Sequence, residues 1–405
     1  MSVVYWVWLQ SVLGYGSRRL HTVLDTFADA HTVYRLRDSA QMRALRLPMR
    51  VMQQLKDPAC FAVATQRVEA CNANGIRIIP YNSPAYPPQL HNIEDPPAVL
   101  YATGALPDVA ALCSVAMVGT RRATEYGKRA AFSLAYRLAR AGCVLVSGIA
   151  GGIDQAVHFG AMAAKAPTIA FLPCGHGQQY LAGKQKLLDS ILASGGCLLS
   201  ELPPGTAMPR NAFPLRNRLL AGVAEATVVV QAPERSGALL TAGSALQQGR
   251  ELFVVPGLPG DAAFAGSHAL IRDGATPVFH ARDVLEALPA SYSLDAARAF
   301  AADTDLAAAY RRIYQHSRNM QPERHKTAPA AQNEKRTVPC EKREPPPGLS
   351  PAAAAVYSAL SADGAYADTL VEQTGLGSGS VLSAITELEI YGLVRSAPGG
   401  KCMLL

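Results

Sequence analysis

Apolar and polar positions follow two different patterns along the chain. Over residues 1–75, apolar residues recur at spacings of three and four, which predicts a group of helices. Residues 112–290 instead contain short apolar runs, each followed by a loop and usually by a segment of helical period. This succession is typical of a mainly parallel sheet with helices on both faces. Strands are expected near residues 114–118, 143–146, 168–172, 197–199, 226–230, 252–255 and 276–279.

Glycine and proline mark the segments around this α/β region. The turn Leu13-Gly14-Tyr15-Gly16 resembles that of a helix-hairpin-helix, whose backbone amides can contact a phosphate. A plain glycine turn in a small helical bundle explains it equally well. Residues 76–104 are rich in proline, which rules out a regular helix there. We interpret them as a strand-containing connector that packs on the next domain.

The apolar pattern decays after residue 291 and returns near residue 350. Residues 317–349 show no apolar period and predict a disordered, slightly basic linker. Residues 350–405 predict three helices and a hairpin, the elements of a winged helix. The expected domains are a helical SAM-like domain (1–75), a connector with an extended Rossmann-like domain (76–290), a linker (291–349), and a winged helix (350–405).

Composition narrows the possible partners and the compartment. The 405 residues carry a formal net charge of +7 with a pI near 9.0, which favours an anionic partner. The eight cysteines include no CxxC pair, so we expect a reducing compartment and no structural zinc. The apolar start lacks a basic region and is interpreted as a buried helix, not a signal peptide. We therefore expect a cytoplasmic protein without a membrane span.

Two predicted strands end in residues suited to holding phosphate. The first ends in Gly119-Thr120-Arg121, which combines a glycine, a hydroxyl and a forked cation. The second ends in Ser147-Gly148, just before a helix start where unpaired amides favour an anion. Asp154, six residues after Gly148, is better explained as a cap of that helix than as a ligand.

Two later segments have similar chemistry. Arg216, Asn217 and Arg218 follow Phe213-Pro214. If the proline begins a helix, both arginines lie in its first turn, where cations are unfavourable unless an anion is bound. Ser236-Gly237 follow the strongest apolar run and fall at another helix start. No GxGxxG fingerprint is present, which disfavours a dinucleotide cofactor, and no metal site or catalytic set is expected.

The ordered motifs resemble the family of DNA-processing protein A, the DprA/Smf family. The resemblance covers most of the chain. The segments that carry it include Val-Gly-Thr-Arg at 118–121, Ser-Gly-Ile-Ala at 147–150, Phe-Pro-Leu-Arg-Asn-Arg at 213–218, Ala-Pro-Glu-Arg-Ser-Gly at 232–237 and Leu-Ile-Arg-Asp-Gly-Ala at 270–275.

The resemblance implies a function as well as the three-domain organisation. Members bind single-stranded DNA without sequence preference, dimerise through the Rossmann-like domain, and load the RecA recombinase in natural transformation. They are not known for catalysis and use no cofactor. Carried over to this chain, the phosphate ligands are Gly119, Thr120, Arg121, Ser147, Gly148, Arg216, Asn217, Arg218, Ser236 and Gly237.

The chain departs from the family pattern in two places. Gly151 stands where members usually have a larger residue, often arginine. The segment 174–186 lacks the usual Gly-Gly-Leu-Asp and Tyr-Pro motifs, but it contains Lys184 and Lys186. Either lysine is a candidate for the missing cation.

Two alternative functions remain open at this stage. A nucleotide-processing hydrolase of Rossmann-like fold would need a placed carboxylate, and Glu234 is the only acid near Ser236-Gly237. A winged-helix regulator would need a basic recognition helix. Residues 377–390 contain Glu387 and Glu389 but no arginine or lysine, which is unfavourable for duplex binding.

Overall fold

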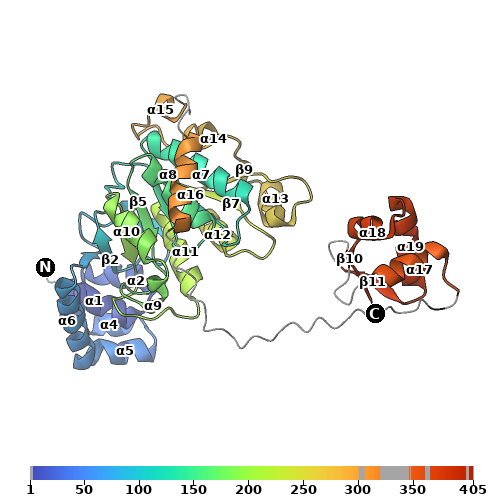
Figure 1. Ribbon diagram of the computed structural model, residues 1–405. Helices are drawn as coiled ribbons and strands as arrows, with labels where there is room; N and C mark the ends of the chain where they lie inside the picture. The colour runs from blue at the N-terminus through green and yellow to red at the C-terminus, as the bar shows by residue number, and fades with distance from the viewer. Residues whose placement is uncertain are drawn as a thin grey trace. The chain divides into compact units, whose positions relative to one another are not determined.

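The computed structural model describes residues 3–300, 306–319, 346, 348–360, 365–397 and 401–404. The chain divides into two compact units, Met1–Glu323 and Arg324–Leu405. The first contains the N-terminal helices and the large sheet, and the second contains the small C-terminal fold (Figure 1).

The first unit begins with a group of helices, as the spacing of apolar residues predicts. They are α1 (Val3–Leu13), α2 (Arg19–Phe27), α3 (Ala30–Arg35), α4 (Ala40–Ala44), α5 (Met49–Lys56) and α6 (Pro58–Ala73). Helix α1 is buried around Trp6, Trp8 and Leu9, and it packs against α6 and the edge of the sheet. Because apolar residues surround α1, it forms the centre of this group and not its surface.

A mainly parallel sheet forms the centre of the unit, which confirms the predicted fold class. Its nine strands run in the order β1-β2-β6-β5-β4-β3-β7-β8-β9. Their bounds are β1 (Arg77–Pro80), β2 (Val99–Gly104), β3 (Ser114–Gly119), β4 (Val144–Ser147), β5 (Thr168–Phe171), β6 (Cys197–Ser200), β7 (Ala226–Gln231), β8 (Glu251–Val254) and β9 (Thr276–Pro277). Strands β3 to β9 pair in parallel, whereas β2 pairs antiparallel with both β1 and β6.

The connector contributes more to the fold than its sequence suggested. Its strands β1 and β2 do not merely pack on the sheet but extend one edge of it. Between them, a short 3-10 helix, η1 (Pro88–Asn92), starts at a proline, which needs no hydrogen-bond donor in that position.

Helices cover both faces of the sheet. One face packs against α7 (Glu125–Arg140), α8 (Ile153–Ala163) and α14 (Ala281–Leu285). The other packs against α11 (Ala212–Val223) and α12 (Gly237–Gln247). The remaining helices of this region are α9 (Gln179–Ala182), α10 (Gln185–Ala193), η2 (Ala262–Phe264) and α13 (Ala265–Arg272).

The strand order contains one reversal. From β3 the chain moves outward through β4, β5 and β6, then returns to place β7 on the other side of β3. In open α/β sheets, ligands bind outside the carboxyl ends of the strands at such a point. The loops after Gly119 and Gln231 lie there.

The first part of the segment predicted as a linker, residues 291–349, is folded. Two helices form within it, α15 (Ala296–Phe300) and α16 (Leu306–Asn319). Tyr310 and Tyr314 of α16 pack edge-on against Phe132 and Phe159, and the Tyr310 hydroxyl donates to Glu125 Oε1 at 2.7 Å. These contacts are made with α7 and α8, far away in sequence, so the local pattern did not reveal them. Most of the segment 317–349 predicted as disordered lies outside the described residues.

The second unit has the predicted winged-helix elements. They are α17 (Pro351–Ala359), β10 (Ala365–Tyr366), α18 (Ala367–Thr374), α19 (Ser378–Ile390), β11 (Val394–Ala397) and β12 (Lys401–Leu404). The sheet order is β10-β12-β11. Glu387 of α19 accepts hydrogen bonds from the backbone N–H and the hydroxyl of Ser350, at 2.7 and 2.6 Å. This acid therefore ties α19 to the start of α17.

Candidate nucleic-acid interface

The loop after β3 is held between β7 and α8. Thr120 N donates to Gln231 O at 2.8 Å, and Ile153 N donates to Thr120 O at 3.3 Å. A Cβ on Gly119 would lie 2.5 Å from Ile153 Cγ1, so only glycine allows α8 to approach the strand end this closely. This packing leaves the side chains of Arg121 and Arg122 exposed at the carboxyl end of the sheet.

Ser147 and Gly148 build the frame of the site. The Ser147 hydroxyl is buried and donates to Met117 O at 2.6 Å. A Cβ on Gly148 would lie 1.9 Å from Arg216 Nη1 and 2.4 Å from Asp154 Oδ2. The glycine therefore makes room for the buried Arg216 guanidinium and the buried Asp154 carboxylate. Neither Ser147 nor Gly148 lines the pocket described below.

Helix α11 begins earlier than the sequence predicted. It starts at Ala212 and includes Pro214 in its first turn, where backbone N–H groups have no partner within the helix. Arg216 and Arg218 consequently lie beyond the first turn. The predicted placement of both arginines in the first turn is therefore wrong, because Pro214 does not occupy the first position of the helix, and their charges do not require an anion there.

Arg216 lies in a buried group of charges. Its side chain is buried and its Nη1 donates to Phe171 O at 3.1 Å, while its Nε has no hydrogen-bond partner among the described residues. Burial lowers the pKa of Arg216, and the charge of Asp154 opposes that shift. Burial likewise raises the pKa of Asp154, opposed first by Arg216. Asp154 Oδ2 also accepts from Ala150 N at 3.1 Å, so it pins the loop before α8. It is not the predicted cap of this helix, because the N-cap is Gly152 and no side chain caps it.

A pocket of about 290 Å³ opens where the chain reverses between β3 and β7. Seven of the predicted ligands line it: Gly119, Thr120, Arg121, Arg216, Asn217, Ser236 and Gly237. Three residues that the sequence analysis missed also line it: Arg122, Phe213 and Arg235. Each of the three lies within or next to one of the family motifs given above, at 118–121, 213–218 and 232–237. Their positions in these motifs could have identified them.

The start of α12 forms one wall of this pocket. Asn217 Nδ2 donates to Gly237 O at 3.3 Å, which ties α11 to the start of α12. Ser236 Oγ caps α12 by accepting from Ala238 N at 3.2 Å. No described atom lies within 4 Å of where a Cβ on Gly237 would stand, so the backbone there is open to a ligand.

The opposite wall combines a cation with an aromatic ring. The Arg121 guanidinium lies 4.2 Å from the centre of the Phe213 ring. Lys184 is half-buried, and burial is the main reason its pKa is lowered. The charge of Asp154 opposes this shift and the charge of Arg121 adds to it. Lys184 therefore lies near this wall, whereas Lys186 is an exposed residue of α10 that does not line the pocket.

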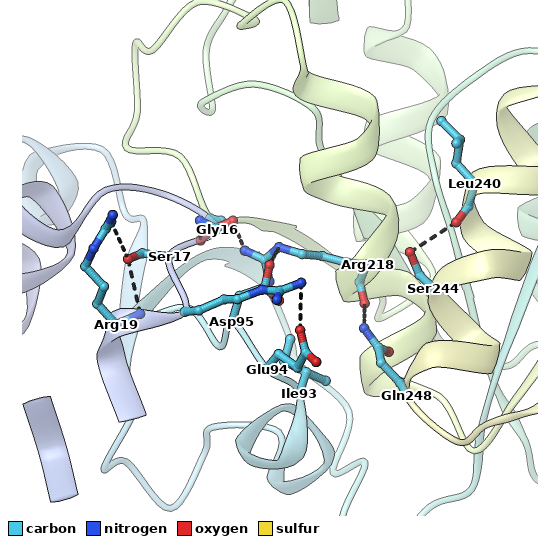
Figure 2. Close-up of polar contacts among 12 residues, drawn as sticks. Gly16, Ser17, Arg19, Ile93, Glu94, Asp95, Arg218, Leu240, Ser244 and Gln248 are labelled. Carbon is cyan, nitrogen blue, oxygen red and sulfur yellow. Dashed lines mark hydrogen bonds and ion pairs between the residues drawn. The ribbon is translucent and has the colours of Figure 1, made fainter. Parts of the chain in front are cut away.

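Arg218 has a different environment from Arg216. Its Nη2 lies 2.5 Å from Glu201 Oε2 and its Nε lies 3.2 Å from Asp95 Oδ2. Glu201 Oε1 accepts from Gly16 N at 2.9 Å. Figure 2 shows Gly16 and Asp95 next to Arg218. The two carboxylates explain Arg218 without a phosphate, and its assignment as a DNA ligand stays a prediction. The amide of Gly16, proposed as a phosphate contact, is bound to a carboxylate of the same chain.

Among the described residues, the pocket lining contains one acidic side chain. Asp154 is the only carboxylate that lines it there, and Glu234 is exposed beside it but not in its lining. Within the described ranges, no group of three or more His, Cys, Asp or Glu residues could hold a metal ion. No described helix is long and apolar enough to cross a membrane.

A buried histidine supports the loop after β4. His158 Nε2 donates to Gly148 O at 2.7 Å, and Nδ1 lies 2.9 Å from Thr168 Oγ1. Nε2 must carry the proton because a carbonyl only accepts. Burial lowers the pKa of His158 to about 4, the bond to Gly148 opposes this shift, and the Arg216 charge adds to it.

Comparison with known proteins identifies related sequences and related structures. Residues 77–289 match the family described as DNA recombination-mediator protein A, and residues 341–400 match the DprA winged helix domain. The DNA processing protein DprA of Bacillus subtilis is 41% identical over 54% of this chain and 74% of its own length. Protein Smf of Synechocystis is 32% identical over 78% of this chain and 77% of its own.

The fold has a counterpart among solved structures. The X-ray structure of DNA processing protein A from Streptococcus pneumoniae superposes with a TM-score of 0.58 at 26% identity. The match covers 71% of this chain and 98% of that protein.

The first prediction concerns the buried charges around Arg218. We expect Arg218→Ala to lower the free energy of unfolding of the first unit by about 3–5 kcal/mol, because it leaves two carboxylates without their cation. Arg18→Ala is the matched control. Arg18 pairs with Glu94 at the surface, with side chains 76% and 69% exposed, so its loss should cost less than about 1 kcal/mol. Equal losses in urea unfolding would contradict a special role for Arg218.

The second prediction concerns His158. In the unfolded chain the His158 side chain becomes protonated below about pH 6.5, whereas in the folded protein its pKa is lowered to about 4. Stability should therefore fall as the pH is lowered through that range, by at most about 3 kcal/mol. In His158→Gln, which keeps a donor for Gly148 O, this part of the loss should disappear. Urea unfolding at about pH 7 and about pH 4.5 measures the difference, and parallel losses in both proteins would refute it.

Proposed function

Because this chain belongs to the DNA recombination-mediator protein A family, we propose that it binds single-stranded DNA through the pocket between the ends of β3 and β7. We further propose that it loads the RecA recombinase onto the bound strand during natural transformation. The observation that carries the proposal is the convergence of four arginines on one pocket: Arg121, Arg122, Arg216 and Arg235.

The charge of the pocket suits phosphate. Its lining holds four guanidinium groups and, among the described residues, one carboxylate. Asp154 lies close enough to Arg216 to oppose the effect of burial on that pKa, and three of the four arginines are exposed. These exposed cations can neutralise phosphates, which supplies most of the non-specific affinity for a strand.

The Arg121 guanidinium and the Phe213 ring, which lie one over the other, offer flat surfaces that favour a single strand over a duplex. A base that is free to unstack can lie against an aromatic ring or a guanidinium plane, whereas a paired base cannot. Every base has such a face, so this contact carries no sequence preference.

The predicted ligands divide into two groups in this proposal. The ligands that face the strand directly are those that line the pocket: Gly119, Thr120, Arg121, Arg216, Asn217, Ser236 and Gly237. Lys184 adds a cation near Arg121. Arg218 acts indirectly, through the two carboxylates that it holds. Ser147 and Gly148 contribute through the frame that places Arg216. We propose no catalytic step, because the only carboxylate among the described lining residues is buried beside a cation.

A homodimer built through the Rossmann-like domain completes the proposal. Strand β9 ends the sheet and pairs only with β8 among the described strands, which leaves its other edge open. Leu258 and Phe279, near this edge in sequence, are 77% and 79% exposed. Apolar side chains beside an open sheet edge favour contact with a second copy. We place the protein in the cytoplasm, where RecA and the incoming strand meet.

The third prediction tests the pocket. We expect Arg121→Ala to weaken binding of an oligothymidylate and to lower the slope of log affinity against log salt by about 0.7, the value for one phosphate of a single strand. Arg311→Ala removes an equally charged, exposed side chain from α16 and should leave the slope unchanged. Fluorescence anisotropy over a salt series measures both. An unchanged slope in Arg121→Ala would exclude this residue as a phosphate ligand.

The fourth prediction tests the dimer. We expect the double variant Leu258→Asp with Phe279→Asp to be a monomer in light scattering, because two carboxylates would be buried without partners. The control is Leu112→Asp, which changes an exposed leucine elsewhere in the first unit, 40% exposed. A dimer that survives the double substitution would place the interface elsewhere.

A further inference from the structure

A strongly basic segment lies in the N-terminal helices, away from the residues of the pocket in sequence. Residues 35–57 contain six basic and two acidic residues, a net charge of +4 out of +7 for the whole chain. The basic residues belong to α3, α4, α5 and the turns between them: Arg35, Arg37, Arg43, Arg46, Arg50 and Lys56. We call this set the basic face. Figure 1 shows α5 at the lower edge of the N-terminal helices.

Three of these cations surround one carboxylate. Lys56 Nζ lies 2.7 Å from Asp38 Oδ1, and Arg43 Nη1 donates to the Asp38 backbone oxygen at 2.8 Å. The hydrogen bond from Lys56 is the main cause of the lowered pKa of Asp38, and the charges of Arg37 and Arg43 add to it. The folded chain thus brings α4 and the end of α5 together around a single negative charge. Asp57, the other acid, caps α6.

The remaining three cations have no such compensation. Arg35, Arg46 and Arg50 are exposed, and their side chains make no hydrogen bond or ion pair with any described residue. Arg46 also has a φ of 49°, in the left-handed region that glycine adopts more easily. Six basic residues with only two acids on one segment indicate a use for this charge.

We propose that the basic face is a second nucleic-acid surface, which binds the sugar-phosphate backbone outside the pocket. Phosphates would relieve the repulsion among the cations, and each contact would release counterions from the strand. The inference rests on the proposed function only for the identity of the polyanion. Arg37 lies 4.2 Å from the centre of the Tyr34 ring. Arg35, Arg46 and Arg50 stack on no described aromatic ring, so they should read charge and not base.

The test compares two triple variants of the full chain. The first is Arg35→Ala, Arg46→Ala and Arg50→Ala. The control is Lys165→Ala, Arg311→Ala and Arg312→Ala, which removes the same charge from exposed positions elsewhere in the first unit. The probes are oligothymidylates of about 6 and about 40 nucleotides and a duplex of about 40 base pairs, because a short probe fills one site and a long one spans several.

We expect the first triple variant to lower the salt slope for the long single strand by about 2, at about 0.7 for each of three phosphates, and to leave the short probe unchanged. The control should change neither. A comparable fall with the duplex would show that the face binds either kind of backbone. An unchanged slope for both long probes, or an equal fall in the control, would overturn the proposal. Arg121→Ala acts on the short probe, so failure of the pocket and failure of the basic face are distinguishable.

Discussion

The contact between Arg218 and Glu201 is the interaction on which the arrangement of the first unit depends. It joins α11 to the end of β6, and Asp95 of the connector lies on the same guanidinium. The second oxygen of Glu201 binds the amide of Gly16, so the turn between α1 and α2 is anchored at the same place. Gln10 of α1 adds a hydrogen bond to the Glu201 backbone oxygen at 2.7 Å. The helical domain, the connector and the sheet thus meet at one buried carboxylate. The position of the Glu201 carboxylate fixes α11, because Arg218 could not move away without leaving a buried carboxylate without its cation.

Helix α11 transmits this constraint to the pocket. Arg216 and Arg218 are two residues apart, and they point to different partners, Phe171 O in one case and Glu201 in the other. Between them, Asn217 holds the start of α12. One helix therefore aligns the wall of the pocket with the N-terminal domain. Gly148 completes the arrangement, since any side chain there would displace the Arg216 guanidinium.

A common feature of the molecule is that its own carboxylates occupy donors suited to an external anion. Glu201 occupies the Gly16 amide, and Asp154 occupies the Ala150 amide beside Arg216. Among the described residues, the exposed cations without such partners include Arg121, Arg122 and Arg235 in the pocket and Arg35, Arg46 and Arg50 on the basic face. A protein that binds a long polyanion needs its unpaired cations at the surface and its paired ones inside, because burying a charge without a partner costs several kcal/mol, about 3–5 or more. This division separates Arg218, which holds the fold, from the exposed arginines that we propose to hold the strand, whereas the buried Arg216 lines the pocket while paired with Asp154.

The fold class, the strands β3 to β9 and seven of the residues that line the pocket follow from the sequence alone. Apolar period is a local property, and parallel strands bring their carboxyl ends to one edge, so Arg121 and Gly237 had to lie near each other. Three features depend on the tertiary structure. Arg216 lines the pocket whereas Arg218 binds Glu201, and Gly148 must lack a side chain. Tyr310 and Tyr314 pack α16 against α7 and α8. The physical reason is the same in each case. Which partner a buried charge or ring meets depends on segments distant in the chain, and no local pattern of residues contains that information.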